Sequence, residues 1–281
     1  MANLILNTPG GAGQVPAGKS LVGAKNNNGT VVNGFADKLF VIDLENLPDP
    51  LNPLNLPPNT MRVRFSSGYT PTMGDTQTLV DATNNIWDIG KTSDVWSSLF
   101  NESSETHNLL EVLGANTKNV TNMSSLFHYC KLLTNVALFD TSNVTNMTQM
   151  FYSCDSLTTV PLFNTSKVTK MFNMFRWDIN LISVPLFDTS NVTEFDYVFA
   201  TCTSLKSIPL FDTSKMVNVK SCFEGCVSVN TGILDLYNRM INQTNPPTSY
   251  DYCFHDCGRN STTGAAELAQ IPNEWKDVWN P

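Results

Sequence analysis

A glycine-rich segment near the N-terminus offers the first candidate for chemistry. Gly13-Gln-Val-Pro-Ala-Gly18-Lys19-Ser20 matches the phosphate-loop pattern G-x-x-x-x-G-K-[ST], and Leu39-Phe-Val-Ile-Asp43 resembles the acidic strand that holds magnesium in nucleotide hydrolases. Such a loop needs a helix directly after it, with the N-terminus of that helix facing the phosphates. Residues 21–34 contain three consecutive asparagines and several glycines, which disfavour a helix. We therefore interpret the segment as a flexible or partner-bound arm, and a hydrolase using Lys19 is the third choice of function.

Four cysteines form two C-x-x-x-C pairs, Cys222 with Cys226 and Cys253 with Cys257. This spacing suits zinc thiolates. However, Cys226 and Cys257 belong to a repeated column, and buried thiols in such columns behave as core residues. Stacked cysteines also lie close enough for disulfides in an oxidising setting. With seven cysteines, an odd number, and no secretory signal, we expect reduced thiols and no metal site.

Other polar groups give weaker signals of chemistry. A column of Asp and Asn would suit a calcium ladder, but calcium requires several carboxylates per ion, so turn closure is the better interpretation. The three histidines, His107, His128 and His255, have no nucleophile or carboxylate at motif spacing. We therefore expect no catalytic residue, no bound cofactor and no metal, and hence a protein that is not an enzyme.

A tandem repeat of 24 residues supplies the elements that position these groups. A fixed period over five copies is typical of a solenoid. The repeated columns are, in order, the Asx column Asn116, Asp140, Asn164, Asp188 and Asp212; the aromatic column Phe127, Phe151, Phe175, Phe199 and Phe223; a second aromatic column Phe139, Phe163, Phe187 and Phe211; and the cysteine column Cys130, Cys154, Cys202 and Cys226, in which Asp178 replaces the missing member.

Each unit changes its hydrophobic period. Residues 144–154 place apolar side chains at steps of three and four, which predicts a short helix, and residues 157–163 tighten towards a step of two, which predicts a strand. One strand and one short helix per unit is the leucine-rich-repeat plan. The predicted fold class is α/β: a short leucine-rich-repeat-like solenoid of strand-plus-short-helix units, with irregular caps and an extended N-terminal arm.

The chain then divides into four predicted regions. Residues 1–58 form the arm and a proline-rich linker, 59–115 the N-terminal cap, 116–258 the repeats, and 259–281 the C-terminal cap. Within them we predict strands at Leu39–Leu44 and Met61–Phe65 and a longer helix at Leu234–Ile241, in the part of the last unit that a seven-residue insertion lengthens. Irregular end units are expected because a solenoid must shield its open core.

The net charge and the distribution of apolar residues exclude two classes of binding partner. The net charge is −8, which argues against nucleic acid as a partner. The sequence contains no run of about 18 apolar residues, so we expect no segment that inserts into a membrane. The N-terminus has no basic region of a secretory signal, so we expect a chain made in the cytoplasm that stays there or leaves by lysis or a dedicated route.

The unit Leu-Phe-Asp-Thr-Ser-Asn-Val-Thr-Asn-Met-Thr-Gln-Met-Phe-Tyr-Ser-Cys-Asp-Ser-Leu-Thr-Thr-Val-Pro at 138–161 closely resembles the BspA-like leucine-rich surface-protein repeat. The resemblance covers roughly residues 108–258. Members are typically bacterial surface adhesins. Similar blocks followed by a tail like Gly-Ala-Ala-Glu-Leu-Ala-Gln-Ile-Pro at 264–272 resemble virion proteins of tailed phages, including crAss-like phages. The family has no catalytic residues to carry over.

The resemblance implies a phage virion surface protein, such as a head or tail fibre or a capsid decoration. Residues 1–58 would contact other virion proteins or form a homo-oligomer, for which a trimer is one arrangement, and the repeats would bind a host surface glycan or protein. The localisation would be the virion. The alternative is a cellular BspA-like adhesin on the bacterial surface with non-classical export.

One unit departs from the repeat consensus and marks a candidate ligand surface. Arg176, Trp177 and Asp178 stand where the preceding unit has Tyr152, Ser153 and Cys154. Trp177 is either a displayed aromatic residue or a filler of the space left by the missing cysteine, and we favour packing.

Overall fold

The computed structural model describes residues 49–101 and 108–276 in full, and the backbone alone of the strands within residues 5–43. The chain divides into two compact units, Met1–Pro50 and Leu51–Pro281. The boundary predicted from the proline-rich linker lies close by, near residue 58. Each unit is described by itself below.

Five strands form the described part of the first unit. β1 (Ile5–Thr8) and β2 (Gly11–Gln14) form an antiparallel pair, and β3 (Lys19–Lys25) lies between β4 (Val31–Val32) and β5 (Lys38–Asp43), antiparallel to both. The strand predicted at Leu39–Leu44 is confirmed as β5. The predicted arm therefore contains paired antiparallel strands in these residues, and the β-branched and apolar residues of β3, β4 and β5 favour that pairing.

The second unit begins with a five-stranded sheet in the order β10-β9-β6-β8-β7. β6 (Thr60–Phe65), which contains the predicted strand Met61–Phe65, pairs antiparallel with β8 (Ile86–Gly90) and β9 (Leu109–Asn116). β7 (Thr76–Asp81) forms one edge, and β10 (Asn135–Val136) pairs parallel with β9 at the other. The sheet therefore joins the first repeated coil directly, through β10.

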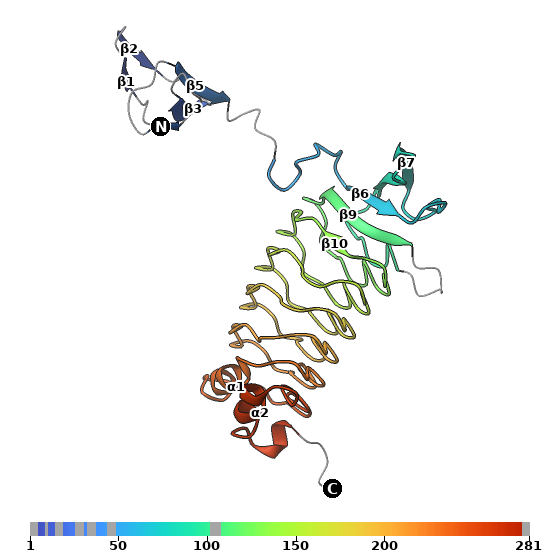
Figure 1. Cartoon of the computed structure of the whole chain (residues 1–281), viewed down its shortest axis with the longest axis vertical. Helices are drawn as coiled ribbons and strands as arrows, with labels where there is room; N and C mark the ends of the chain where they lie inside the picture. Colours follow the sequence, from blue (N-terminus) through green and yellow to red (C-terminus); the bar gives the residue numbers. More distant parts are fainter. Residues whose placement is uncertain are drawn as a thin grey trace. The chain divides into compact units, whose positions relative to one another are not determined.

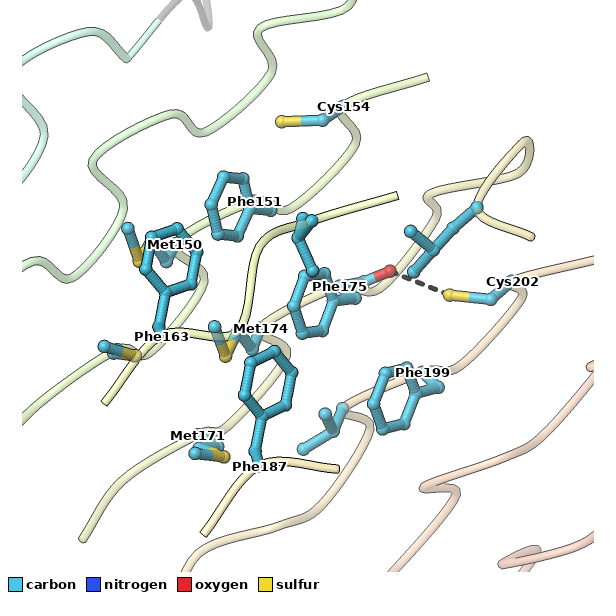
Figure 2. Packing of buried hydrophobic residues seen from close by; sticks show 14 of the residues in the cluster. Met150, Phe151, Cys154, Phe163, Met171, Met174, Phe175, Phe187, Phe199 and Cys202 are labelled. Carbon is cyan, nitrogen blue, oxygen red and sulfur yellow. Dashed lines mark hydrogen bonds between the residues drawn. The ribbon is translucent and has the colours of Figure 1, made fainter. Parts of the chain in front are cut away.

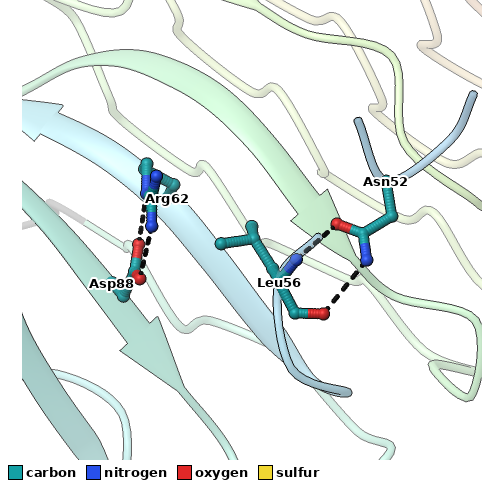
Figure 3. Close-up of polar contacts among 4 residues, drawn as sticks. All are labelled: Asn52, Leu56, Arg62 and Asp88. Atoms are coloured by element: carbon teal, nitrogen blue, oxygen red, sulfur yellow. Dashed lines mark hydrogen bonds and ion pairs between the residues drawn. The ribbon is translucent and has the colours of Figure 1, made fainter. Parts of the chain in front are cut away.

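Polar contacts hold the chain entering this sheet (Figure 3). The Asn52 side chain accepts a hydrogen bond from the Leu56 backbone N–H at 2.9 Å and donates to the Leu56 carbonyl at 3.0 Å. Arg62 on β6 donates two hydrogen bonds to the carboxylate of Asp88 on β8, at 2.7 and 2.8 Å. The first pair closes a turn that Pro53 favours, and the second adds a bidentate cross-strand contact to the ladder.

Within residues 140–211 the coils contain neither the short helices nor the strands that the hydrophobic period predicts, whereas the first coil has the two-residue strand β10 at the position equivalent to 159–160. Residues 148–153 form consecutive turns, and 157–163 have no assigned helix, strand or turn. Backbone N–H groups alternate in their partners: Met150 and Tyr152 bond three residues back, whereas Gln149, Phe151 and Ser153 bond to carbonyls in the next coil. Because every second donor leaves its own segment, no continuous helical or strand pattern can form. The helix predicted at 144–154 is wrong for this reason, and the strand predicted at 157–163 is wrong because these residues have no ladder partner.

Successive coils nevertheless lie on one another in strict register (Figure 1). Parallel bridges join equivalent residues, and most steps are 24 residues: Val95, Asn122, Asn146, Lys170, Glu194, Asn218 and Ser249. The described part of the chain is therefore mixed α/β, with the five-stranded sheet, two helices and a stack of coils between them.

Stacked aromatic rings fill the core of these coils (Figure 2). Neighbouring rings of the first column, extended at its two ends by Phe100 and Phe254, have centroids 5.3–6.0 Å apart and nearly parallel planes. The second column packs against the first; Phe163, for example, lies 6.2 Å from Phe151. Both predicted aromatic columns are thus confirmed as core.

A helical segment covers the last coil. α1 (Ile233–Ile241) contains the predicted helix Leu234–Ile241, and α2 (Thr262–Leu268) and the 3-10 turn η1 (Asn273–Trp275) follow. Trp275 is buried and lies against Tyr250, with centroids 4.3 Å apart. Residues 277–281, part of the predicted cap, lie outside the described residues.

Candidate functional site

The three residues singled out by the sequence do not share one environment. Asp178 is completely buried in the cysteine column, where its Oδ1 accepts a hydrogen bond from the Cys154 backbone N–H at 2.7 Å. Burial raises the pKa of Asp178 well above its usual range. Trp177 is 42% exposed, so the favoured interpretation that it fills the space of the missing cysteine is wrong. Asp178 itself fills that space and cannot belong to a surface.

The backbone explains why Trp177 points outward. It has φ +70°, and the same place in other coils is also left-handed, at Tyr129, Ser153, Thr201 and Gly225. Left-handed backbone is unusual for residues other than glycine. Here it is imposed by the alternating turns, whose N–H groups reach the next coil: Trp177 donates to the Ala200 carbonyl at 2.9 Å. The turns therefore present one face, which we call the turn face, with side chains at fixed spacing.

Aromatic side chains gather on this turn face across consecutive coils. His128 packs against Tyr129, at 4.4 Å between centroids, and stacks on Tyr152 of the next coil at 4.8 Å. The Arg176 guanidinium lies over the ring of Tyr197 at 4.8 Å. The cluster, called the aromatic face below, comprises His128, Tyr129, Tyr152, Phe172, Arg176, Trp177 and Tyr197.

The electrostatics of the aromatic face favour neutral rings beside one cation. Partial burial lowers the pKa of His128 and so favours its neutral form. Burial likewise raises the pKa of Tyr152, against a smaller opposing effect of nearby Arg176. Rings with polar edges next to a guanidinium can bind a ligand that presents apolar C–H faces together with hydroxyl or acidic groups.

Sequence reasoning missed most of the aromatic face, although a signal was present. Its residues occupy four neighbouring columns of the repeat that change from coil to coil, whereas the core columns stay constant. For example, His128, Tyr152 and Arg176 are equivalent positions in successive units. The sequence criterion was a departure from the repeat consensus in one unit. The same criterion in every unit also selects Tyr129, Tyr152 and Tyr197.

The columns that suggested metals are occupied by structural bonds. Asp140, Asp188 and Asp212 each accept a hydrogen bond from the backbone two residues on, at 2.8–3.0 Å, which confirms turn closure. All seven cysteines are buried thiols. Among residues 49–101 and 108–276, no group of three or more metal-binding side chains lies together.

Half of the phosphate-loop pattern, residues 15–18, falls outside the described residues. Lys19 and Ser20 begin strand β3, where the chemistry would need a helix. His107 also lies outside the described residues. In the described part of the chain, no helix has the length and apolar character needed to cross a membrane.

Comparison of the sequence with known protein families identifies the family of this chain. A profile described as "Mycoplasma protein of unknown function, DUF285" matches residues 94–180 and 158–257, more than half of the chain. The chain belongs to this family. The match supports a BspA-like surface repeat protein at that coarse level. No curated protein and no solved structure gives a significant match.

Proposed function

We propose that this protein is a non-enzymatic binding protein displayed on the surface of a tailed-phage virion, as a head or tail fibre or a capsid decoration. In this proposal the stacked coils are a short solenoid of the leucine-rich-repeat type. Residues 1–58 attach it to other virion proteins and form a homo-oligomer, such as a trimer. The ligand is a glycan or protein of the host surface.

The observation that carries the binding role is the aromatic face. Six aromatic or imidazole rings and one guanidinium lie on four consecutive coils, and Trp177 is 42% exposed. Backbone bonds between coils fix their spacing. A sugar ring has an apolar C–H face that packs on an aromatic ring and hydroxyl groups that bond to its polar edge, so a row of rings suits an extended saccharide.

An array of immobilised bacterial-envelope and mucin-type oligosaccharides tests this role. We expect the full chain to bind a subset, and Tyr152→Ala or Trp177→Ala to weaken binding at least about tenfold, as expected for loss of an anchoring aromatic residue. Leu186→Ala is the matched control, because Leu186 is 59% exposed but is not part of the aromatic face. Equal binding by all four proteins would refute the assignment of the face.

The virion location needs a separate test. Mass spectrometry of purified phage particles should detect the chain, and light scattering of the full chain should give an oligomer. Absence from particles together with a monomer in solution would overturn this part.

A cellular surface adhesin is the second candidate, and the family description favours it because it names a cellular bacterium. Recovery of the chain from an intact cell surface, in a strain without phage particles, would select it over the virion. The aromatic-face test applies equally to both candidates.

A further inference from the structure

Two cysteines of the last two coils face each other in the core. The Sγ atoms of Cys222 and Cys253 are 3.2 Å apart, and both side chains are completely buried. In earlier units the same position holds a hydrocarbon or thioether side chain, namely Leu126, Met150, Met174 and Val198. The repeat pattern therefore does not place a thiol here, and two successive departures from it bring a pair together where the stack ends.

The backbone holds this pair in place. Ser221 and Phe223 donate hydrogen bonds to the carbonyls of Asp251 and Cys253, both at 2.9 Å, and these bonds align the two coils on either side of Cys222. The members of the regular cysteine column behave differently. Cys202 and Cys226, for example, donate to phenylalanine carbonyls of earlier coils at 3.0 Å.

We propose that Cys222 and Cys253 are a redox pair that forms a disulfide and fastens the last coil to the one before it. A disulfide has its sulfurs about 2.05 Å apart, so they must approach by roughly 1 Å, which modest side-chain rotation supplies. The bond would close a loop containing α1 and the Asn245-Pro246-Pro247 turn, the irregular insertion of the last unit. This inference does not depend on the ligand or on the virion.

The chemistry requires an oxidant, for which a small disulfide such as oxidised glutathione suffices. One cysteine thiolate attacks a glutathione sulfur and releases the first glutathione. The second cysteine then attacks the mixed disulfide and releases the other. Two protein thiols and one glutathione disulfide thus become one protein disulfide and two glutathione thiols, with both thiol protons passing to the released glutathiones.

Cys253 is the more accessible starting point once the cap opens. It lies in the outermost coil, under the segment that carries Trp275, and Phe254 donates a hydrogen bond to the Trp275 carbonyl at 3.0 Å. Burial raises the pKa of both thiols. The thiolate therefore forms during local opening, and the oxidation rate should follow cap opening.

The test uses the full-length reduced protein in oxidised glutathione, followed by alkylation under denaturing conditions and peptide mapping. We expect one disulfide joining the peptides of Cys222 and Cys253, five alkylated cysteines, and a Tm raised by roughly 5–10 °C. Cys253→Val is the control, because Val198 already occupies this column. That variant should form no disulfide and show no rise in Tm on oxidation.

A second variant separates slow reaction from no reaction. Trp275→Ala loosens the cap and should speed formation of the same disulfide at least about tenfold. Seven alkylated cysteines in both the wild type and Trp275→Ala, or a disulfide joining Cys226 to Cys257 instead, would overturn the proposal.

Discussion

Replacing Asp178 by cysteine should stabilise the protein, and increasingly so as pH rises. Asp178 interrupts the cysteine column inside the core, and its Oδ2 is a buried oxygen that has no hydrogen-bond partner among the described residues. A buried polar atom without a partner costs about 1–3 kcal/mol. Cysteine at 178 would restore the pattern of Cys154 and Cys202, whose thiols donate to phenylalanine carbonyls at 3.1 and 3.0 Å.

The pH dependence follows from the direction of the pKa shift. Burial raises the folded-state pKa of Asp178 well above its value in the unfolded chain, which is about 3.9. Between these two values the folded state holds more protons than the unfolded state, so the contribution of Asp178 to stability falls as pH rises. The loss is up to about 1.4 kcal/mol per pH unit in this window. Asp178→Cys removes it.

Urea unfolding of both proteins from about pH 4 to about pH 8 measures the difference. We expect Asp178→Cys to be more stable by about 1–3 kcal/mol near the lower limit, with the advantage growing towards the upper limit. Asp178→Asn, which keeps an acceptor for the Cys154 N–H, should lose the same pH dependence. A difference that stays flat with pH, or a less stable Asp178→Cys at neutral pH, would refute the reasoning.

Three further changes test the packing of the stack by urea unfolding and hydrogen exchange. Phe175→Ala removes a ring stacked between Phe151 and Phe199 at 5.5 and 5.4 Å, and should lower the free energy of unfolding by about 3–5 kcal/mol; a loss below about 1 kcal/mol would contradict the stacked core. Thr165→Val leaves a carbonyl without the hydroxyl that donates to it at 2.8 Å and should cost about 1–2 kcal/mol, whereas exposed Thr159→Val should cost almost nothing. Gly264→Ala places a methyl group against the Val229 carbonyl oxygen. Protection of the backbone amides of residues 250–276 from hydrogen exchange should therefore fall, while protection of residues 120–200 should not change. Unchanged protection of residues 250–276 would refute the close contact.

The sequence was sufficient to predict the core of the repeats but not the path of their backbone. The columns of Phe151 and Phe163 follow from the period, because a side chain that recurs in every unit must occupy the same place in the stack. The expected helix at 144–154 failed because its N–H groups divide their bonds between two coils, and no local pattern records the partner in the next coil. The backbone is left-handed at Gln149 and Ser153, and because neither residue is a glycine the sequence gives no sign of this conformation.

The candidate site was predicted only in part, for a related reason. Trp177 and Arg176 were found because they break the consensus, and both belong to the aromatic face. Asp178 breaks it as well but lies in the core. The direction in which each side chain points depends on the turn geometry. The hydrophobic period predicted a helix in place of these turns, so it could not give these directions.

The binding role of the aromatic face is the central claim, and a carbene footprint tests it most directly. The full chain would be labelled with and without the oligosaccharide that binds best on the array. The account predicts protection of Tyr129, Tyr152 and Trp177, with unchanged labelling of the exposed leucine column Leu162, Leu186 and Leu210. Protection of the leucines, with the aromatic face labelled as before, would contradict it.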